Sequence, residues 1–237
     1  MPYTQITLLA LRTQLGARYD SVGFWSTTEA NSAINEALRV WNLLTGMWKR
    51  RILIATTANT VFYSLPSTLV YDVRTEFNQV PLEQSSIFDL NNGRGNWRGE
   101  TTATGGAVPT RPTLWAPVGL MRLAVWPAHA AGGGTLTVDG VRQTPVLVVD
   151  ADFVDLGQCE LTTLIGYALH ILAFKLSGPL FQSTLPLYRR FIVAAADQNA
   201  RLRSSTWYRK VMGLDLNRQQ HPVRANPQLQ EAPVGDS

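Results

Sequence analysis

The sequence predicts an α+β fold: helices from the N- and C-terminal regions form a small bundle, an antiparallel β-sandwich or barrel is inserted between them, and an extended C-terminal arm follows. Three observations predict this class. Apolar residues recur at helical spacing before residue 49 and after residue 154, they alternate between those limits, and they lose their periodicity after residue 203. We therefore expect three units: 1–48 with 155–203, then 49–154, and 204–237.

The first 48 residues predict two helices. Thr4 is placed to cap a short helix, and Gly16 is placed to end it. Ser26 and Glu29 then have the spacing of a capping box, in which each residue bonds the backbone N–H of the other. The helix that follows carries one broad apolar stripe, made of Ala30, Ala33, Ile34, Ala37, Leu38, Trp41 and Leu44.

The segment from residue 50 to residue 149 predicts short strands separated by turns rich in Gly and Pro. Asn59 is the expected turn between the first two strands, and residues 85–90 are expected to form a helical turn on the rim. Short strands with this punctuation favour a small sandwich or barrel. The expected strands contain residues 52–54 and 61–65, and then cover 69–77, 80–84, 113–115, 121–126, 135–141 and 145–149.

Helical spacing returns at Asp155, which is placed as an N-cap with Gln158 three residues later. This helix is expected to end at Ser177-Gly178-Pro179, and a second helix to run from about Leu185 to Arg203. Because one helix pair buries little surface, we expect the helices of both terminal regions to pack together. The segment after residue 203 has three prolines and no apolar stripe, which predicts an extended arm.

Composition narrows the class of protein further. The chain has 237 residues, a net charge of +4 and seven tryptophans, but only 16% of its residues are charged, against about 25% in an average domain. We expect part of such a surface to be covered by a partner. The one cysteine, Cys159, excludes a disulfide framework. Residues 1–5 have no basic region and no apolar run approaches about 20 residues, so we expect a soluble, non-exported chain without a membrane partner.

The search for catalytic chemistry finds no enzyme signature. The nucleophile motif G-x-S-x-G is missing, and the histidines have no partner at a suitable spacing. His170 is interpreted as a partly buried helix residue bonded to a carbonyl group. We therefore predict no catalytic residues and no cofactor. Asp150 and Asp152 lie in the densest acidic cluster and are weak candidates for a metal site, although a strand exit followed by a helix N-cap explains them more simply.

Two segments are candidates for binding. Between Arg201 and Arg224 six basic residues are opposed by one acidic residue, a local excess of five. Aromatic residues among arginines are typical of interface anchors and of nucleic-acid contacts, which makes Trp207, Tyr208, Arg209, Lys210, Arg218 and Arg224 the candidate interface. The second segment is the loop 93–99, whose Arg94, Trp97 and Arg98 are candidates for contact with single-stranded nucleic acid or with a tail component. A surface hairpin is the simpler interpretation of this loop.

The order of elements resembles the head-to-tail adaptor proteins (connector or tail-tubular A-type) of tailed bacteriophages, especially short-tailed ones. The resemblance spans about residues 25–205. It is carried by the helix 30–41, which leads through Trp48 into a strand pair that ends at residues 63–66, and by the segments 108–115 and 121–127. The helix 161–175 and a following helix with Tyr188, Phe191 and Asn199-Ala200-Arg201-Leu202 complete the pattern. The loop 101–106 and the arm after Ser204 have no counterpart in the pattern.

The resemblance implies a non-enzymatic virion protein of the phage neck that is assembled in the host cytoplasm. Such adaptors form a ring, commonly of twelve subunits, between the portal protein and the next tail component, and double-stranded DNA passes through the lumen without sequence-specific binding. The helical part and the C-terminal arm would then bind the portal, and the loops of the β part would face the tail.

Two alternatives stay open at this point. The first is a nucleic-acid-binding module that uses the basic arm and the loop 93–99. The second is a carbohydrate- or receptor-binding β module, for which Trp97, Trp115 and Trp126 are the motive.

Overall fold

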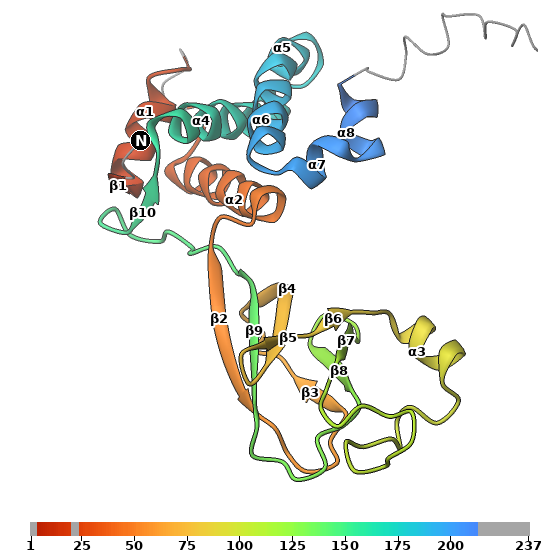
Figure 1. Ribbon diagram of the computed structural model, residues 1–237. Helices are drawn as coiled ribbons and strands as arrows, with labels where there is room; N and C mark the ends of the chain where they lie inside the picture. The colour runs from red at the N-terminus through yellow and green to blue at the C-terminus, as the bar shows by residue number, and fades with distance from the viewer. Residues whose placement is uncertain (1–3, 20–23, 213–237) are drawn as a thin grey trace, which may run out of the picture.

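The computed structural model describes residues 4–19 and 24–212. Helices gather at one end of the molecule and two four-stranded sheets at the other (Figure 1). The strands β2 (Lys49–Ala55) and β9 (Thr135–Arg142) pair side by side and lead from the helical end into the β part. The mixed α+β class predicted from the sequence is therefore confirmed.

The helical part is built from segments at both ends of the chain. Ser26 Oγ accepts a hydrogen bond from the Glu29 N–H at 3.2 Å, and the Glu29 carboxylate accepts one from the Ser26 N–H at 2.8 Å, which confirms the predicted capping box. Gly46 ends that helix with a φ of 63°, a left-handed conformation that favours glycine. The helices are α1 (Leu8–Gly16), α2 (Thr27–Thr45), α4 (Gln158–Ala173), the 3₁₀ helix η1 (Phe174–Leu176), α5 (Gly178–Ser183), α6 (Leu185–Gln198), α7 (Ala200–Ser204) and α8 (Thr206–Val211).

The helices enclose one buried apolar cluster, as the sequence predicted. The stripe of α2 is buried from Ala30 to Trp41, and the Trp41 ring meets the Phe191 ring of α6 at a centroid distance of 5.4 Å. Ile165 of α4 is buried in the same cluster. Burying this apolar surface is what holds helices from the two terminal regions together.

Two four-stranded sheets form the β part. Their orders are β2-β9-β4-β5 and β3-β8-β7-β6. The described pairs within them are antiparallel except β6–β7, which is parallel and departs from the predicted antiparallel pattern. The remaining bounds are β3 (Phe62–Ser64), β4 (Leu69–Phe77), β5 (Val80–Pro81), β6 (Glu83–Gln84), β7 (Leu114–Pro117) and β8 (Arg122–Trp126), with the short helix α3 (Ile87–Gly93) between β6 and β7.

Alternation along β8 explains how the sheets are packed. Leu123 and Val125 belong to a cluster that also contains Leu136 and Val138 of β9, so both sheets share this core. The residues that alternate with them, Ala124 and Trp126, belong to a second cluster on the other face. This is a sandwich-like packing, and the strand pairs among the described residues close no barrel.

The N-terminal prediction was wrong in detail. Thr4 caps no helix, because Thr4–Thr7 forms strand β1, which pairs with β10 (Phe153–Leu156). The N-cap of α1 is Thr7, whose hydroxyl accepts the Ala10 N–H at 3.2 Å. Gly16 lies inside the helix, and Ala17 is the C-cap. A strand whose partner lies about 150 residues along the chain leaves no local signal of the pairing.

The predicted turn at Asn59 between the first two strands is confirmed, but the strands that it joins do not pair with each other. Asn59 does adopt a turn conformation with a φ of 55°, but β2 pairs with β9 and β3 pairs with β8, in the other sheet. The predicted strand 145–149 is not a strand. The structure replaces it by an irregular segment that lies against α2, and the strand of this region is β10 instead.

The C-terminal boundaries differ as well. Asp155 lies in β10, and the N-cap of α4 is Gly157, whose N–H donates to the Glu160 carboxylate. The predicted helix 185–203 breaks at Asn199, whose side chain caps α7. The arm predicted to be extended from residue 204 begins with α8, so residues 206–211 are helical.

Candidate partner-binding surfaces

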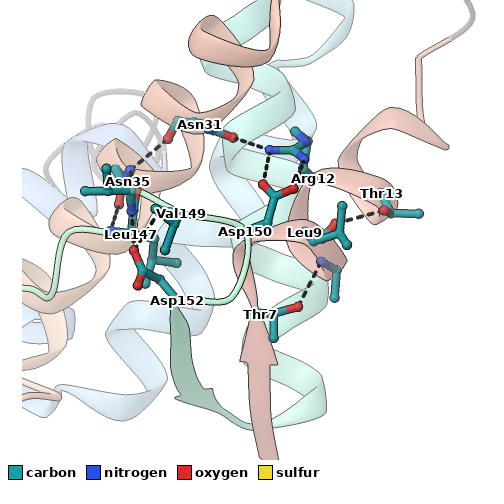
Figure 2. Close-up of polar contacts among 12 residues, drawn as sticks. Thr7, Leu9, Arg12, Thr13, Asn31, Asn35, Leu147, Val149, Asp150 and Asp152 are labelled. Atoms are coloured by element: carbon teal, nitrogen blue, oxygen red, sulfur yellow. Dashed lines mark hydrogen bonds and ion pairs between the residues drawn. The ribbon is translucent and has the colours of Figure 1, made fainter.

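Asp150 and Asp152 lie in the segment that joins β9 to β10 (Figure 2). The Arg12 guanidinium donates to both oxygens of the Asp150 carboxylate, at 2.9 and 3.1 Å. The Asp152 carboxylate accepts the N–H groups of Val148 and Val149, at 2.6 and 2.8 Å, and these hydrogen bonds lower the pKa of Asp152. Both carboxylates therefore stabilise the conformation of this segment. In residues 4–19 and 24–212, no three metal-ligating side chains lie close enough together to hold a metal ion.

The same segment is fastened to α2 by an amide. Asn35 Nδ2 donates to the Leu147 carbonyl and Asn35 Oδ1 accepts the Leu147 N–H, both at 2.9 Å. Leu147 is thereby held in the helical core. On the other side of the segment, the Leu8 N–H donates to the Asp152 carbonyl at 2.8 Å, which ties it to the start of α1.

Because the Leu147 side chain is held in the helical core, the side chains on either side of it face the solvent. Val146 and Val148 are each 71% exposed, and Val149 and Phe153 are more than half exposed. We call these four residues, Val146, Val148, Val149 and Phe153, the apolar ridge. Sequence reasoning assigned residues 145–149 to a strand and did not identify the ridge, because an alternating run does not show by itself which side faces the solvent.

A second apolar surface lies over α4, α5 and α6. It is a recess of about 290 Å³ that we call the aromatic recess, lined by Tyr167, His170, Ile171, Phe174, Phe181 and Tyr188. The His170 ring stacks against Phe181 and Tyr188 at centroid distances of 4.7 and 5.5 Å. Phe174 stands at the rim and is 74% exposed.

His170 is buried, as the sequence predicted, but its partner is a hydroxyl group rather than a carbonyl. Its Nδ1 lies 2.7 Å from Thr184 Oγ1. Burial lowers the pKa of His170, because desolvation disfavours the charged imidazolium. A neutral ring held between two aromatic rings serves packing.

The loop 93–99 is tied into the β part. Trp97 is 2% exposed, and its indole N–H donates to Asn91 Oδ1 at 2.8 Å. The Arg94 guanidinium lies 4.1 Å from the centroid of the Trp126 ring, and Arg98 lies 5.4 Å from that of Trp97. Trp97 is therefore a core residue whose ring faces are covered, which does not support the predicted stacking on a nucleotide base.

The prediction of a carbohydrate-binding module rested on three tryptophans, and their burial does not support it either. Trp115 and Trp126 are buried together with Trp97. Stacking on a sugar needs an accessible ring face, and these three indoles face the two cores of the β part.

Neighbouring side chains of the basic aromatic segment face opposite ways on the short helix α8. Trp207 is 44% exposed, whereas Tyr208 is buried in the helical core. Lys210 is exposed and Arg209 is partly exposed. The structure thus leaves Trp207 and Lys210 accessible and turns Tyr208 inward. Arg218 and Arg224 lie outside the described residues.

The comparisons with known proteins complete this picture. No helix in the described part of the chain is long and apolar enough to cross a membrane. A search of curated proteins finds no match. The family model of the SU10 adaptor protein matches residues 1–225, which include the helices, both sheets and α8. That family consists of structural adaptors and is not an enzyme family. The chain therefore belongs to the SU10 adaptor protein family, a family of phage head–tail adaptors.

Proposed function

We propose that this phage adaptor forms a ring, of twelve subunits, that joins the portal protein to the next tail component in the virion neck. Double-stranded DNA passes through the lumen of the ring without sequence-specific binding. The observation that carries the proposal is the family match, because it covers residues 1–225 and so includes the helical part and both sheets rather than one module. Assembly then takes place in the host cytoplasm, before the tail is added.

The helical part is the end that meets the portal in this proposal. Support comes from α8, where Trp207 and Lys210 are exposed at the end of the described chain. An exposed tryptophan beside basic residues has the composition of an interface anchor. Arg218 and Arg224 follow α8 in the sequence.

The β part is the end that meets the tail. It exposes two large apolar side chains: Phe88 of the helix α3 is 72% exposed, and Leu120, in the turn before β8, is 80% exposed. Apolar side chains in such positions are typical of surfaces that bind another protein.

The experiment that tests the proposal combines the purified protein with the portal protein of the same phage. Electron microscopy is expected to show one ring of adaptor subunits stacked on each portal, and light scattering is expected to give the mass of the added ring. The portal has to be present, because a subunit can stay monomeric until its first partner orders it. A protein that remains monomeric at a high concentration of portal would contradict the proposal.

A further inference from the structure

The last three helices of the described chain carry an excess of positive charge. They are α6, α7 and α8, which follow one another at the helical end of the molecule (Figure 1). Residues 185–212 contain six basic residues and one acidic residue, an excess of five that is larger than the +4 of the whole chain. The basic residues are Arg189, Arg190, Arg201, Arg203, Arg209 and Lys210, and the acidic residue is Asp197.

Elsewhere in the described helical part, the basic side chains have partners within the fold. Three of them form ion pairs and a fourth donates to a backbone carbonyl: Arg12–Asp150, Arg39–Glu36, Lys175–Glu29, and Arg18 to Thr162. On α6–α8 the balance differs, because Arg189, Arg190 and Lys210 have no carboxylate partner in the described part of the chain. Arg203 pairs with Asp197 at 3.4 Å, but both side chains are more than half exposed, and such a pair contributes little. The excess charge is therefore available to a partner.

Helical geometry places Arg190 and Arg203 on the outer side of these helices. Ile192 is buried in the helical core, and a residue two positions away points to nearly the opposite side of a helix. Arg190 therefore points outward, and it is exposed. Asp197 follows Arg190 by seven residues, about two turns along α6, so it lies on the same side. The Arg203–Asp197 pair brings Arg203 of α7 to that side as well.

The helix α8 adds a cation and an exposed ring to this surface. Tyr208 is buried in the helical core, so Lys210, two residues later, points outward and is exposed. Trp207 is 44% exposed and precedes Lys210 by three residues, which makes the two side chains neighbours on the helix. α8 also packs against α6. We call Arg190, Arg203 and Lys210, together with Trp207, the cationic face.

The chemistry of the cationic face selects an anionic partner, because its charges have little compensation within the fold. Trp207 favours a protein over DNA as that partner. A duplex keeps its bases stacked inside, so its phosphate surface offers no apolar site for an indole ring. An exposed tryptophan among cations is typical of a protein interface anchor. In the proposed ring DNA also has to move through the lumen, and cations that faced it would bind its phosphates by counterion release.

We propose that the cationic face of α6–α8 binds an acidic surface of the portal protein. Opposite charges steer the two proteins together and fix their register, while Trp207 supplies the apolar anchor that slows dissociation. The portal surface that meets α6–α8 therefore carries carboxylates opposite Arg190, Arg203 and Lys210, and an apolar site for the indole ring. The inference rests on the proposed function and names the chemistry of the partner at the helical end.

The test measures by surface plasmon resonance how the adaptor binds the immobilised portal protein of the same phage. For the wild type, the association rate constant is expected to fall at least about tenfold between about 0.05 and 0.3 M salt, because salt screens the attraction. The double variant Arg190→Glu with Lys210→Glu is expected to associate at least about tenfold more slowly than the wild type at the lower salt concentration.

The matched control reverses two arginines of the β part. Arg111 and Arg122 are exposed, and neither has a carboxylate partner among the described residues. Arg111→Glu with Arg122→Glu therefore changes the net charge by the same amount, and this control is expected to associate within about threefold of the wild-type rate. Circular dichroism checks that each variant folds, and Gln replaces Glu in any variant that does not.

The outcomes separate the inference from the proposed function. A wild-type association rate that is independent of salt, or a rate that the two double variants change equally, would overturn the inference while leaving the ring intact. Fluorescence anisotropy with a short DNA duplex of random sequence tests the other anionic partner. If Arg190→Glu with Lys210→Glu weakens duplex binding and leaves portal binding unchanged, the cationic face belongs to DNA and the inference is wrong. A wild type that binds no portal at any salt concentration would overturn the proposed function, and the inference with it.

Discussion

Asn42 shows at the scale of one residue how the helical part is joined to the first sheet. Its side chain is 1% exposed, with Nδ2 donating to the Arg142 carbonyl at 2.8 Å and Oδ1 accepting the Trp48 N–H at 3.0 Å. One amide near the end of α2 therefore holds the chain entering β2 and the chain leaving β9. Without the Asn42 amide, both backbone groups would lose these partners in a partly buried setting.

Replacing Asn42 by Ala is expected to lower the free energy of unfolding by about 1–3 kcal/mol, because two hydrogen bonds in a partly buried setting are lost together. Urea unfolding measures the change. Asn31→Ala is the matched control, since Asn31 makes a single 3.3 Å contact with Arg12 in a partly buried setting; its effect is expected to stay within about 0.5 kcal/mol. Equal effects of the two substitutions would show that the Asn42 bonds contribute nothing special.

Glu29 carries a second residue-scale prediction, through pH. Its carboxylate accepts hydrogen bonds from Lys175 Nζ and from the Ser26 N–H and hydroxyl, which lower the pKa of Glu29 from 4.5 to about 2. The carboxylate form thus stabilises the fold above pH 4.5, and this contribution is lost as the pH falls from 4.5 toward 2. The melting temperature of Glu29→Gln is expected to lie below that of the wild type at pH 7.

The gap in melting temperature between Glu29→Gln and the wild type is expected to narrow as the pH falls below 4.5. Lys175→Met serves as the control, because it removes the largest cause of the shift, so the pKa of Glu29 measured by NMR is expected to rise toward its ordinary value. A gap that is the same at pH 7 and pH 3 would contradict the assignment.

Single elements show which parts of the fold the sequence could predict. α2 was predictable because its signals are local: the capping box lies within four residues, and the stripe repeats along one helix. β1 was not, because Thr4 pairs with Leu156, and neither segment indicates the other. The bounds of β4 were predicted correctly. Its pairing with β9 was not predicted, because no short turn connects the two strands.

The candidate surfaces follow the same distinction. Composition identified Trp207 and Tyr208 together, but only the packing of α8 shows that the first is exposed and the second buried. The ridge was missed because Asn35, more than 100 residues away, decides that Leu147 faces inward. Residues that local chemistry identifies are therefore found in the sequence, and the side that they present to a partner is set by distant contacts.

The neighbours in α8 make an element-scale prediction. Tyr208→Ala is expected to lower the free energy of unfolding by about 3 kcal/mol, because it empties a buried aromatic site. Trp207→Ala is expected to leave stability within about 1 kcal/mol of the wild type and to weaken binding to portal at least about tenfold. Thermal unfolding and a portal pull-down measure the two effects. Unchanged portal binding by Trp207→Ala would remove Trp207 from the interface.

The whole molecule has separate cores at its two ends. The buried residues of the helices form one cluster, and the described buried residues of the two sheets form two others that contain no helical-bundle side chain. The parts are joined chiefly by two crossings of the chain, before β2 and after β9, and by the Asn42 bonds. Cores that share so few contacts are coupled weakly.

This separation predicts two unfolding transitions in calorimetry rather than one. Leu38→Ala leaves a cavity only in the helical core, and Leu123→Ala leaves one only in the shared core of the sheets. Each of these leucines is at most 1% exposed. Each substitution is expected to cost about 2–5 kcal/mol and to lower one transition while leaving the other in place. If both variants shift a single transition by the same amount, the two cores unfold as one unit, and the prediction of two transitions is wrong.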